Sequence, residues 1–405
     1  MMTYGRDSRA GAWWALIALA LGGFGIGCSE FIAMGLLPEM AQSLLPDRYA
    51  ASPEEANAQA GWLITVYALG VVIGAPTIAV FATRHPRRTV LVWLLAVCVL
   101  GSLATAAAPN FALALLARLV VGLPHGAYFG IASLAAASLA PPGRRGQAVA
   151  LVLMGISVAN VVGLPALTWA GQVAGWRIAL LAIAVIFAIA LVAVRLLVPP
   201  LPGDRGASFR GELRVFKEPQ LWMALLIGAI GFGGFFAILT YVAPMATAVA
   251  GIDPGFVPVV LIIAGVGMTI GNVLGGRLAD RSLERAMVVA FALMIASLAA
   301  MHLLASNPIG FVASLVLLAI GCTGLVPLIQ MRIMDIAKEG QSLAAALNHS
   351  SLNIANAVGA ALGGVVIAAG FGYLSPAVIA IGLATLGLAL TLVSFRMERR
   401  RAPGA

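Results

Sequence analysis

The stretch that decides the fold runs from Trp13 to Met40 and reads WWALIALALGGFGIGCSEFIAMGLLPEM. Its apolar part exceeds the roughly 20 residues that a helix needs to cross the hydrocarbon core of a bilayer. Between Trp13 and Leu37 it contains one charged side chain, Glu30. A charge at that depth is costly unless it is paired, can be protonated or faces water. We therefore predict a membrane-spanning helix that carries Glu30 as a candidate proton-carrying group.

The composition of the whole chain supports a membrane protein. Of its 405 residues, 61% are hydrophobic and 10% are charged, whereas soluble domains have about 25% charged residues. The net charge of +9 does not indicate nucleic-acid binding, because the basic residues lie in short connections between apolar runs. The three cysteines lie in apolar runs without metal-ligand spacing, so we predict that they are packing residues and that no metal is bound.

Apolar windows predict twelve membrane-spanning runs. Runs of this length cross lipid as helices, because an open sheet would leave its backbone hydrogen bonds unsatisfied. The predicted fold class is an all-α membrane protein. The runs are 13–39, 60–82, 89–108, 111–139, 147–172, 176–198, 220–247, 256–279, 286–305, 309–333, 341–369 and 373–396.

The distribution of basic residues predicts the orientation. With the N-terminus inside, all but three of the 24 lysines and arginines fall in cytoplasmic segments; Arg48 and Arg177 lie outside and Arg118 lies within a run. The positive-inside rule therefore places both termini in the cytoplasm. The acidic, polar segment 42–59 is expected to be a solvated external loop.

The connection 199–219 is rich in proline, glycine and charge, which is typical of a linker. It separates six runs in residues 1–198 from six runs in residues 220–405. The two parts repeat: residues 81–91 match residues 278–288, an offset of 197, and residues 160–163 match residues 356–359, an offset of 196. Repeats related by an axis along the membrane normal are typical of transporters, with the site between the halves.

With these features, the sequence resembles the major facilitator superfamily. It is most similar to the twelve-span drug:proton antiporters of the sugar-efflux and chloramphenicol-efflux branch. The resemblance is carried by the first-helix phrase SEFIAMGLLP at residues 29–38, by the Arg118-to-Gly122 motif of the fourth run and by two further motifs. The fifth-helix motif corresponds here to Gly155, Asn160, Gly163 and Pro165, with Leu164 between the glycine and the proline. The gating motif corresponds to Arg84 and Arg88 in the first half and to Gly276, Asp280, Arg281 and Arg285 in the second.

Glu30 and Arg118 are the central candidates. Glu30 is expected about 12 Å inward from the outer end of its run, and Arg118 about 10 Å inward from the outer end of the fourth run, at 1.5 Å per residue. Opposite charges at similar depth suggest that Glu30 alternately binds a proton and pairs with Arg118 or with the solute. The structural alternative is a fixed ion pair between helices. His125, seven residues after Arg118, shares its helix face and could relay protons, bind solute or bond to a neighbouring helix.

Two further groups are candidates for the solute path. His349, Asn353 and Asn356 form a polar stripe on the eleventh run, which is expected to face the bundle interior. The stripe suits solute binding, but asparagines also bond across helices, a role that we favour for Asn160 and Asn356. Aromatic residues of the glycine-rich seventh run could line an adaptable cavity or simply pack; they are Phe232, Phe235, Phe236 and Tyr241.

These observations predict a secondary transporter. No phosphate-binding loop, zinc spacing or nucleophile turn occurs in the sequence, so an enzyme is not expected and the proton gradient, with no cofactor, is the expected energy source. The resemblance implies a monomeric antiporter of the bacterial inner membrane that contacts protons, lipid and a small organic solute such as a sugar or a drug. The alternatives are a proton-coupled uptake symporter and a membrane-embedded sensor that does not transport.

Overall fold

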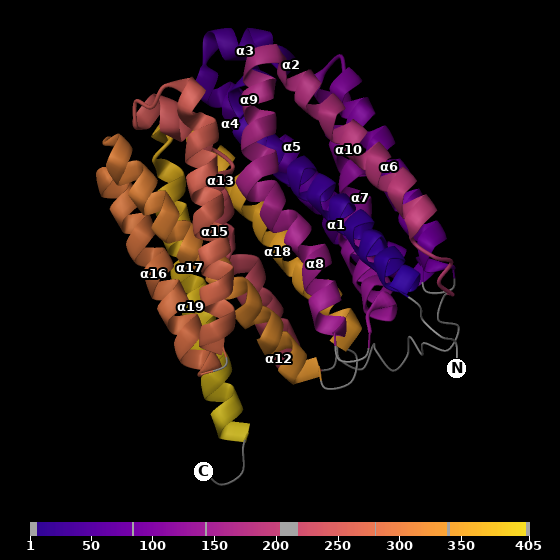
Figure 1. Cartoon of the computed structure of the whole chain (residues 1–405). Coiled ribbons are helices and arrows are strands. Elements are labelled where there is room, and N and C mark those ends of the chain that lie inside the picture. Colours follow the sequence, from indigo (N-terminus) through magenta and orange to yellow (C-terminus); the bar gives the residue numbers. More distant parts are fainter. Residues whose placement is uncertain are drawn as a thin grey trace.

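The computed structural model of the chain describes residues 6–82, 85–141, 144–202, 218–279, 281–337 and 341–401. Within these ranges there are twelve helices long and apolar enough to cross a membrane, and no strand. The start of α1 and the end of α19 lie at the same end of the bundle, which we call the terminal end (Figure 1). The other end is called the distal end. The predicted all-α membrane fold of twelve spans is confirmed.

The spans form two bundles of six. In the first bundle they are α1 (Arg6–Gly35), α4 and α5 (Pro53–Ala60 and Trp62–Ala82), α6 (Arg87–Ala107), α7 (Phe111–Leu139), α8 to α9 (Arg145–Val158, a π-helical turn η1 at Ala159–Gly163, then Leu164–Ala174) and α10 (Trp176–Leu197). In the second they are α12 to α13 (Pro219–Leu226, η3 at Ile227–Gly231, then Gly233–Leu239), α15 (Val257–Ala279), α16 (Leu283–Leu304), α17 (Pro308–Ala337), α18 (Gln341–Val366) and α19 (Ser375–Arg401).

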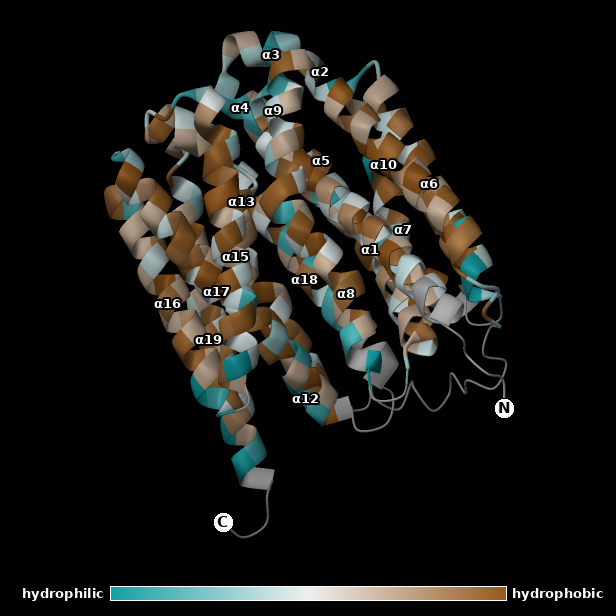
Figure 2. Ribbon diagram, in the orientation of Figure 1, coloured by the Kyte–Doolittle hydropathy of each residue, from teal (hydrophilic) through white to brown (hydrophobic). Residues whose placement is uncertain are grey.

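Hydropathy follows the architecture (Figure 2). Hydrophobic residues cover the middle of the spans, and hydrophilic residues gather toward the two ends of the bundle. Helix α18 is an exception, because hydrophilic residues continue along it into the middle of the bundle. A polar stripe in that position contacts other helices rather than lipid, since buried polar groups need hydrogen-bond partners.

The segment 42–59, expected to be a solvated external loop, is largely exposed up to Glu55, but it is helical. This segment lies at the distal end and folds into α2 (Leu37–Leu44), α3 (Pro46–Ala51) and the beginning of the second span, α4. Helix α2 buries one apolar face, made of Leu37, Met40, Ala41 and Leu44. Helix α4 starts where the Ser52 hydroxyl accepts a hydrogen bond from the Glu55 N–H at 3.2 Å, which satisfies a donor that the helix start leaves free.

The same glycine contacts recur in both bundles. A methyl group on Gly74 of α5 would overlap the Leu123 carbonyl oxygen of α7, and one on Gly271 of α15 would overlap the Ile320 carbonyl oxygen of α17. The two contacts are offset by 197 residues, the offset that the sequence repeat showed. In each bundle, therefore, the second and fourth spans can touch backbone to backbone only because one position lacks a side chain.

The two bundles are joined at the distal end. The Asn57 amide of α4 donates to the Tyr373 hydroxyl at 2.7 Å, and the Gln172 amide of α9 donates to the Pro254 carbonyl oxygen at 3.1 Å. Next to them, Tyr241 of the second bundle packs so tightly on Gly61 that a methyl group there would overlap its hydroxyl. These contacts close the distal end between the bundles.

Replacing Gly74 with alanine tests the backbone contact between α5 and α7. We expect Gly74→Ala to lower the free energy of unfolding by about 1–3 kcal/mol, the usual cost of overpacking a well-filled core. Thermal unfolding of the purified protein in detergent measures this. Gly130→Ala is the matched control, because Gly130 lies on α7 with nothing within 4 Å of an added methyl group. Equal melting temperatures for the two variants would contradict the contact.

Candidate functional site

Glu30 lies in the interior of the bundle, where α1 meets the second half. Its side chain is 6% exposed, and its Oε1 accepts a long hydrogen bond of 3.5 Å from the Asn356 amide of α18. Asn356 is fully buried, and no donor among the described residues reaches its Oδ1. The carboxyl group of one half is therefore bonded to an amide of the other half.

Arg118 is buried on α7, with 1% of its surface exposed. Its guanidinium donates to three backbone carbonyl oxygens: Ser29 at 2.8 Å, Leu63 at 3.3 Å and Glu30 at 3.5 Å. It also lies over the Tyr67 ring, 4.3 Å from the centroid. Arg118 thus joins α1, α5 and α7 within the first half.

The expected direct ion pair between Glu30 and Arg118 is not formed in this conformation. Arg118 reaches the backbone of Glu30, and the ion pairs of the described residues do not include the two side chains. The reason is geometric, since the carbonyl oxygens of α1 and α5 lie nearer and satisfy the guanidinium. The two groups remain neighbours, so the positive charge still acts on the carboxyl group through space.

A row of aromatic rings runs from Arg118 to the second half. The Tyr67 hydroxyl lies 3.2 Å from His125 Nδ1. The His125 ring packs edge-on against Phe129 at 5.5 Å, and Phe129 stacks on His349 of α18 at 5.9 Å with an angle of 9° between the rings. The structure therefore brings His125 and His349 into one cluster of rings. The cluster includes Tyr67, the ring that Arg118 contacts.

Asn353 belongs to the same stripe, but its amide donates to the His349 carbonyl oxygen of its own helix at 3.0 Å. The sequence analysis missed Tyr67 and Phe129. A tyrosine in the middle of an apolar run was the available signal for Tyr67, because tyrosine in membrane helices is enriched at the interfaces. Phe129 gave no such signal among the many apolar residues of α7.

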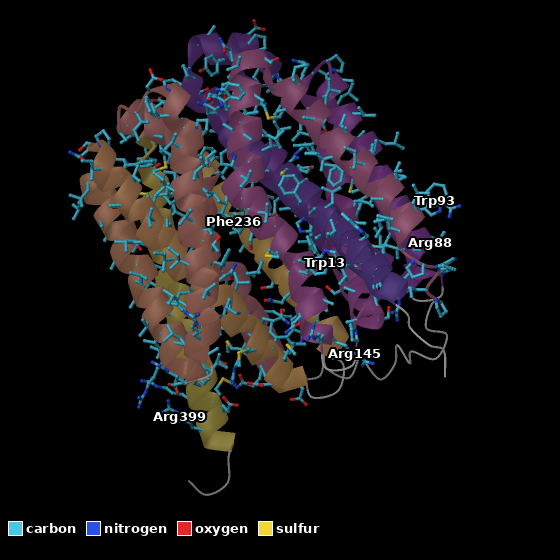
Figure 3. All side chains as sticks on the ribbon, in the orientation of Figure 1. Trp13, Arg88, Trp93, Arg145, Phe236 and Arg399 are labelled. Atoms are coloured by element: carbon cyan, nitrogen blue, oxygen red, sulfur yellow. The ribbon has the colours of Figure 1, made fainter. Side chains whose placement is uncertain are left out.

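The seventh-run aromatics lie in a separate cluster. Phe232, Phe235 and Phe236 contact one another with ring centroids 5.5–5.7 Å apart, and Phe236 packs on Gly359 of α18. Figure 3 places Phe236 at mid-height of the molecule. Tyr241 lies toward the distal end, where its hydroxyl donates to the Ala360 carbonyl oxygen at 2.9 Å. None of the contacts that we describe joins these residues to Glu30.

The fifth-helix motif residues lie at helix contacts. Gly155 and Gly163 pack on α1, since a methyl group on either would overlap backbone or side-chain atoms of that helix. Asn160 and Pro165 lie where the π-helical turn η1 meets α9. The Asn160 carbonyl group packs on Gly265 of α15, so this segment touches the second half.

Two gating-motif residues, Arg84 and Asp280, fall outside the described residues, and the other four lie at the terminal end. The Arg88 guanidinium donates to the Val198 carbonyl oxygen at 3.3 Å. Gly276 is half-buried, and Arg281 and Arg285 are exposed. Figure 3 shows Arg88, Arg145 and Arg399 around the terminal end, where Arg399 forms an ion pair with Glu284.

Comparison with known proteins agrees with this architecture. The sequence model of the Major Facilitator Superfamily matches residues 19–304 and 248–405. The inner membrane transport protein YdhP of Escherichia coli K12 is 38% identical over 388 residues, 96% of each chain. AraJ of the same strain is 32% identical over 392 residues, 96% of each chain. These relatives match the branch that the sequence motifs indicated.

A chloramphenicol resistance protein of Streptomyces lividans is 30% identical over 367 residues, 88% of this chain and 89% of that protein. Among solved structures, a D-xylose–proton symporter superposes with a TM-score of 0.78 at 14% identity, over 94% of this chain and 97% of the other. At that identity the likeness concerns the fold alone. From the family match and the identity to YdhP and AraJ, the chain belongs to the major facilitator superfamily and is a membrane transporter, not an enzyme.

Proposed function

We propose that this transporter is a proton-coupled antiporter that exports a small organic solute by alternating access. The observation that supports this most directly is the buried carboxyl group of Glu30, which is bonded across the two halves to Asn356. A carboxyl group is stable as an ion in water and as a neutral acid in apolar surroundings. Rocking of the halves would break the bond to Asn356 and change the access of water to Glu30, so conformation and protonation are linked.

Arg118 serves as a fixed counter-charge in this mechanism. Its hydrogen bonds to backbone carbonyl oxygens keep it in place whether Glu30 is ionised or neutral. An ionised Glu30 gains from the nearby positive charge, and a protonated Glu30 leaves the guanidinium satisfied. The carboxyl group can therefore change its protonation state without leaving a buried cation unpartnered, which would be costly.

The solute is proposed to bind between the halves, beside Glu30. His125 and His349 lie on opposite halves, and the Phe129 ring contacts both of them. Aromatic walls with a few polar groups are typical of small-molecule sites. Asn353 is assigned to the same path, and Phe232, Phe236 and Tyr241 are proposed to join it when the halves move. A phenicol-like drug or a sugar fits this mixture of rings and polar groups.

The terminal end is proposed to face the cytoplasm of a bacterial cell, with the chain in the inner membrane. The basic side chains at that end support this orientation through the positive-inside rule, and YdhP is named an inner membrane protein. The distal contacts between the halves then close the external side. The conformation described here is accordingly an inward-facing one.

Proton movement in everted membrane vesicles tests the proposal. With an acidified lumen, an antiporter should release lumenal protons when its solute is added, whereas an uptake symporter should carry protons inward with the solute. The symporter is kept as the alternative because the fold is shared with a D-xylose–proton symporter. Susceptibility profiling of an expressing strain against sugars and phenicols identifies the solute to use. Absence of solute flux in liposomes under every proton gradient would contradict both.

Glu30→Gln tests the coupling group. We expect solute-driven proton release to fall by at least about tenfold, because a glutamine cannot exchange a proton, whereas solute–solute exchange should stay within about threefold of the wild type. Both are measured in the same reconstituted vesicles. Glu55→Gln is the control, since Glu55 is an exposed acid of α4. Proton release of wild-type magnitude in Glu30→Gln would remove Glu30 from the mechanism.

Asn356→Ala tests the bond between the halves. Losing the donor to Glu30 should lower the free energy of unfolding by about 1 kcal/mol, the usual contribution of a hydrogen bond between membrane helices, and should alter the pH profile of transport. Thr391→Val is the control, because the buried Thr391 hydroxyl donates to the Gly387 carbonyl oxygen of its own helix. Identical pH profiles for Asn356→Ala and the wild type would show that this bond does not take part in coupling.

A further inference from the structure

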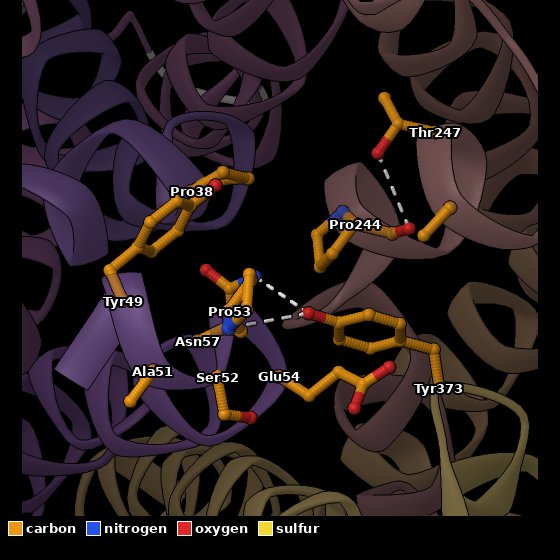
Figure 4. Close-up of a pocket in the computed structure, with 11 residues that line it drawn as sticks. Pro38, Tyr49, Ala51, Ser52, Pro53, Glu54, Asn57, Pro244, Thr247 and Tyr373 are labelled. Atoms are coloured by element: carbon orange, nitrogen blue, oxygen red, sulfur yellow. Dashed lines mark hydrogen bonds between the residues drawn. The ribbon is translucent and has the colours of Figure 1, made fainter.

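A cavity lies at the distal end, between the halves (Figure 4). Its volume is about 450 Å³, within the range of roughly 300–1,000 Å³ of small-molecule pockets. The first half contributes residues of α2, α3 and α4, and the second half contributes residues of α14 (Val242–Pro244) and η4 (Met245–Val249) together with Tyr373. None of the residues described around Glu30 lines it.

Asn57 gives this cavity a buried, unused acceptor. Its side chain is 3% exposed, and its amide nitrogen donates to Tyr373. Among the described residues, no donor lies within hydrogen-bond distance of its Oδ1. A buried acceptor without a partner costs about 1–3 kcal/mol. A ligand that donates a hydrogen bond would recover that cost.

The lining of the cavity carries a carboxylate, which favours a positively charged hydrogen-bond donor. Glu54 extends toward the Tyr373 ring (Figure 4), and Tyr49 lines the cavity from α3. Burial raises the pKa of the Tyr373 phenol to about 12, opposed by the hydrogen bond from Asn57 and assisted by the charge of Glu54, so Tyr373 is uncharged near neutral pH. The described lining residues include no lysine, arginine or histidine.

A carboxylate beside two aromatic rings is the chemistry that recognises organic cations, because the ring faces attract positive charge. We propose that the distal cavity binds a small organic ammonium ion, with Glu54 as its counter-charge, the rings of Tyr49 and Tyr373 against its alkyl groups and Asn57 Oδ1 as an acceptor. Since its walls come from both halves, an occupant stabilises the arrangement in which the distal end is closed.

Choline is the test probe, and 3,3-dimethylbutan-1-ol is its uncharged counterpart of the same shape. Calorimetric titration of the purified protein in nanodiscs should show choline binding at least about tenfold more tightly than the alcohol, a difference of about 1.4 kcal/mol. Glu54→Gln should reduce choline affinity by a similar factor. Glu55→Gln, one position along the same helix but outside the lining, should change it by less than about twofold.

Two aromatic variants keep the test decisive if a charge change disturbs the fold. Tyr49→Phe retains the ring and should bind choline as the wild type does, whereas Tyr49→Ala should lose binding. Equal affinities for choline and the alcohol, equal effects of Glu54→Gln and Glu55→Gln, or binding of glucose that depends on Glu54 would each overturn the proposal. Binding at the site around Glu30 is distinguished because Glu54→Gln would leave it unchanged.

Distance measurements between spin labels test the effect on conformation. Ala50 on α3 and Ser306 between α16 and α17 are exposed residues of opposite halves, so cysteines placed there can be labelled, and the three native cysteines are buried. Choline should increase the population with the shorter distance in the labelled protein and leave it unchanged when Glu54→Gln is added. Choline binding with no change in the distances would overturn the proposed link to closure.

Discussion

The structure depends on one constraint, the burial of a carboxyl group within a membrane-spanning helix. Glu30 is almost inaccessible to water, and its hydrogen-bond partner Asn356 belongs to the other half of the molecule. An amide donor can bond a carboxyl group in either protonation state, whereas a bidentate arginine would hold it as an ion. At 3.5 Å the contact is also long for a hydrogen bond, so it is weaker than one of ordinary length.

Arg118 shows how the first half tolerates a cation beside that carboxyl group. Backbone carbonyl oxygens of α1 and α5 take its hydrogen bonds, and the Tyr67 ring covers its face. The guanidinium is thus satisfied by groups that do not titrate and that move with its own half. These hydrogen bonds do not use the Glu30 carboxyl group, so a change in its protonation does not remove them.

The spans and the contacts differ in how far the sequence predicts them. The twelve helices follow from hydropathy, because each span must satisfy its own backbone in lipid, and Glu30 is visible as a lone charge. The bond to Asn356 and the ring contact of Phe129 with His349 depend on how two separate bundles face each other, which no local pattern encodes. The contact of Asn57 with Tyr373 could not be predicted for the same reason, because it also joins the two halves.

The sequence repeat relates Glu30, Arg118 and His125 of the first half to equivalent positions in the second half, where other residues lie. At the offset of 197 that relates the glycine contacts of Gly74 and Gly271, Glu30 corresponds to Ile227, Arg118 to Leu315 and His125 to Cys322. This backbone contact is therefore repeated in the two halves, but Glu30, Arg118 and His125 of the central site are not. Two similar bundles can rock about a shared axis, and an acid present in only one of them meets different neighbours at each end of that motion. In the proposed antiport mechanism, this asymmetry is what links the protonation of Glu30 to the conformation.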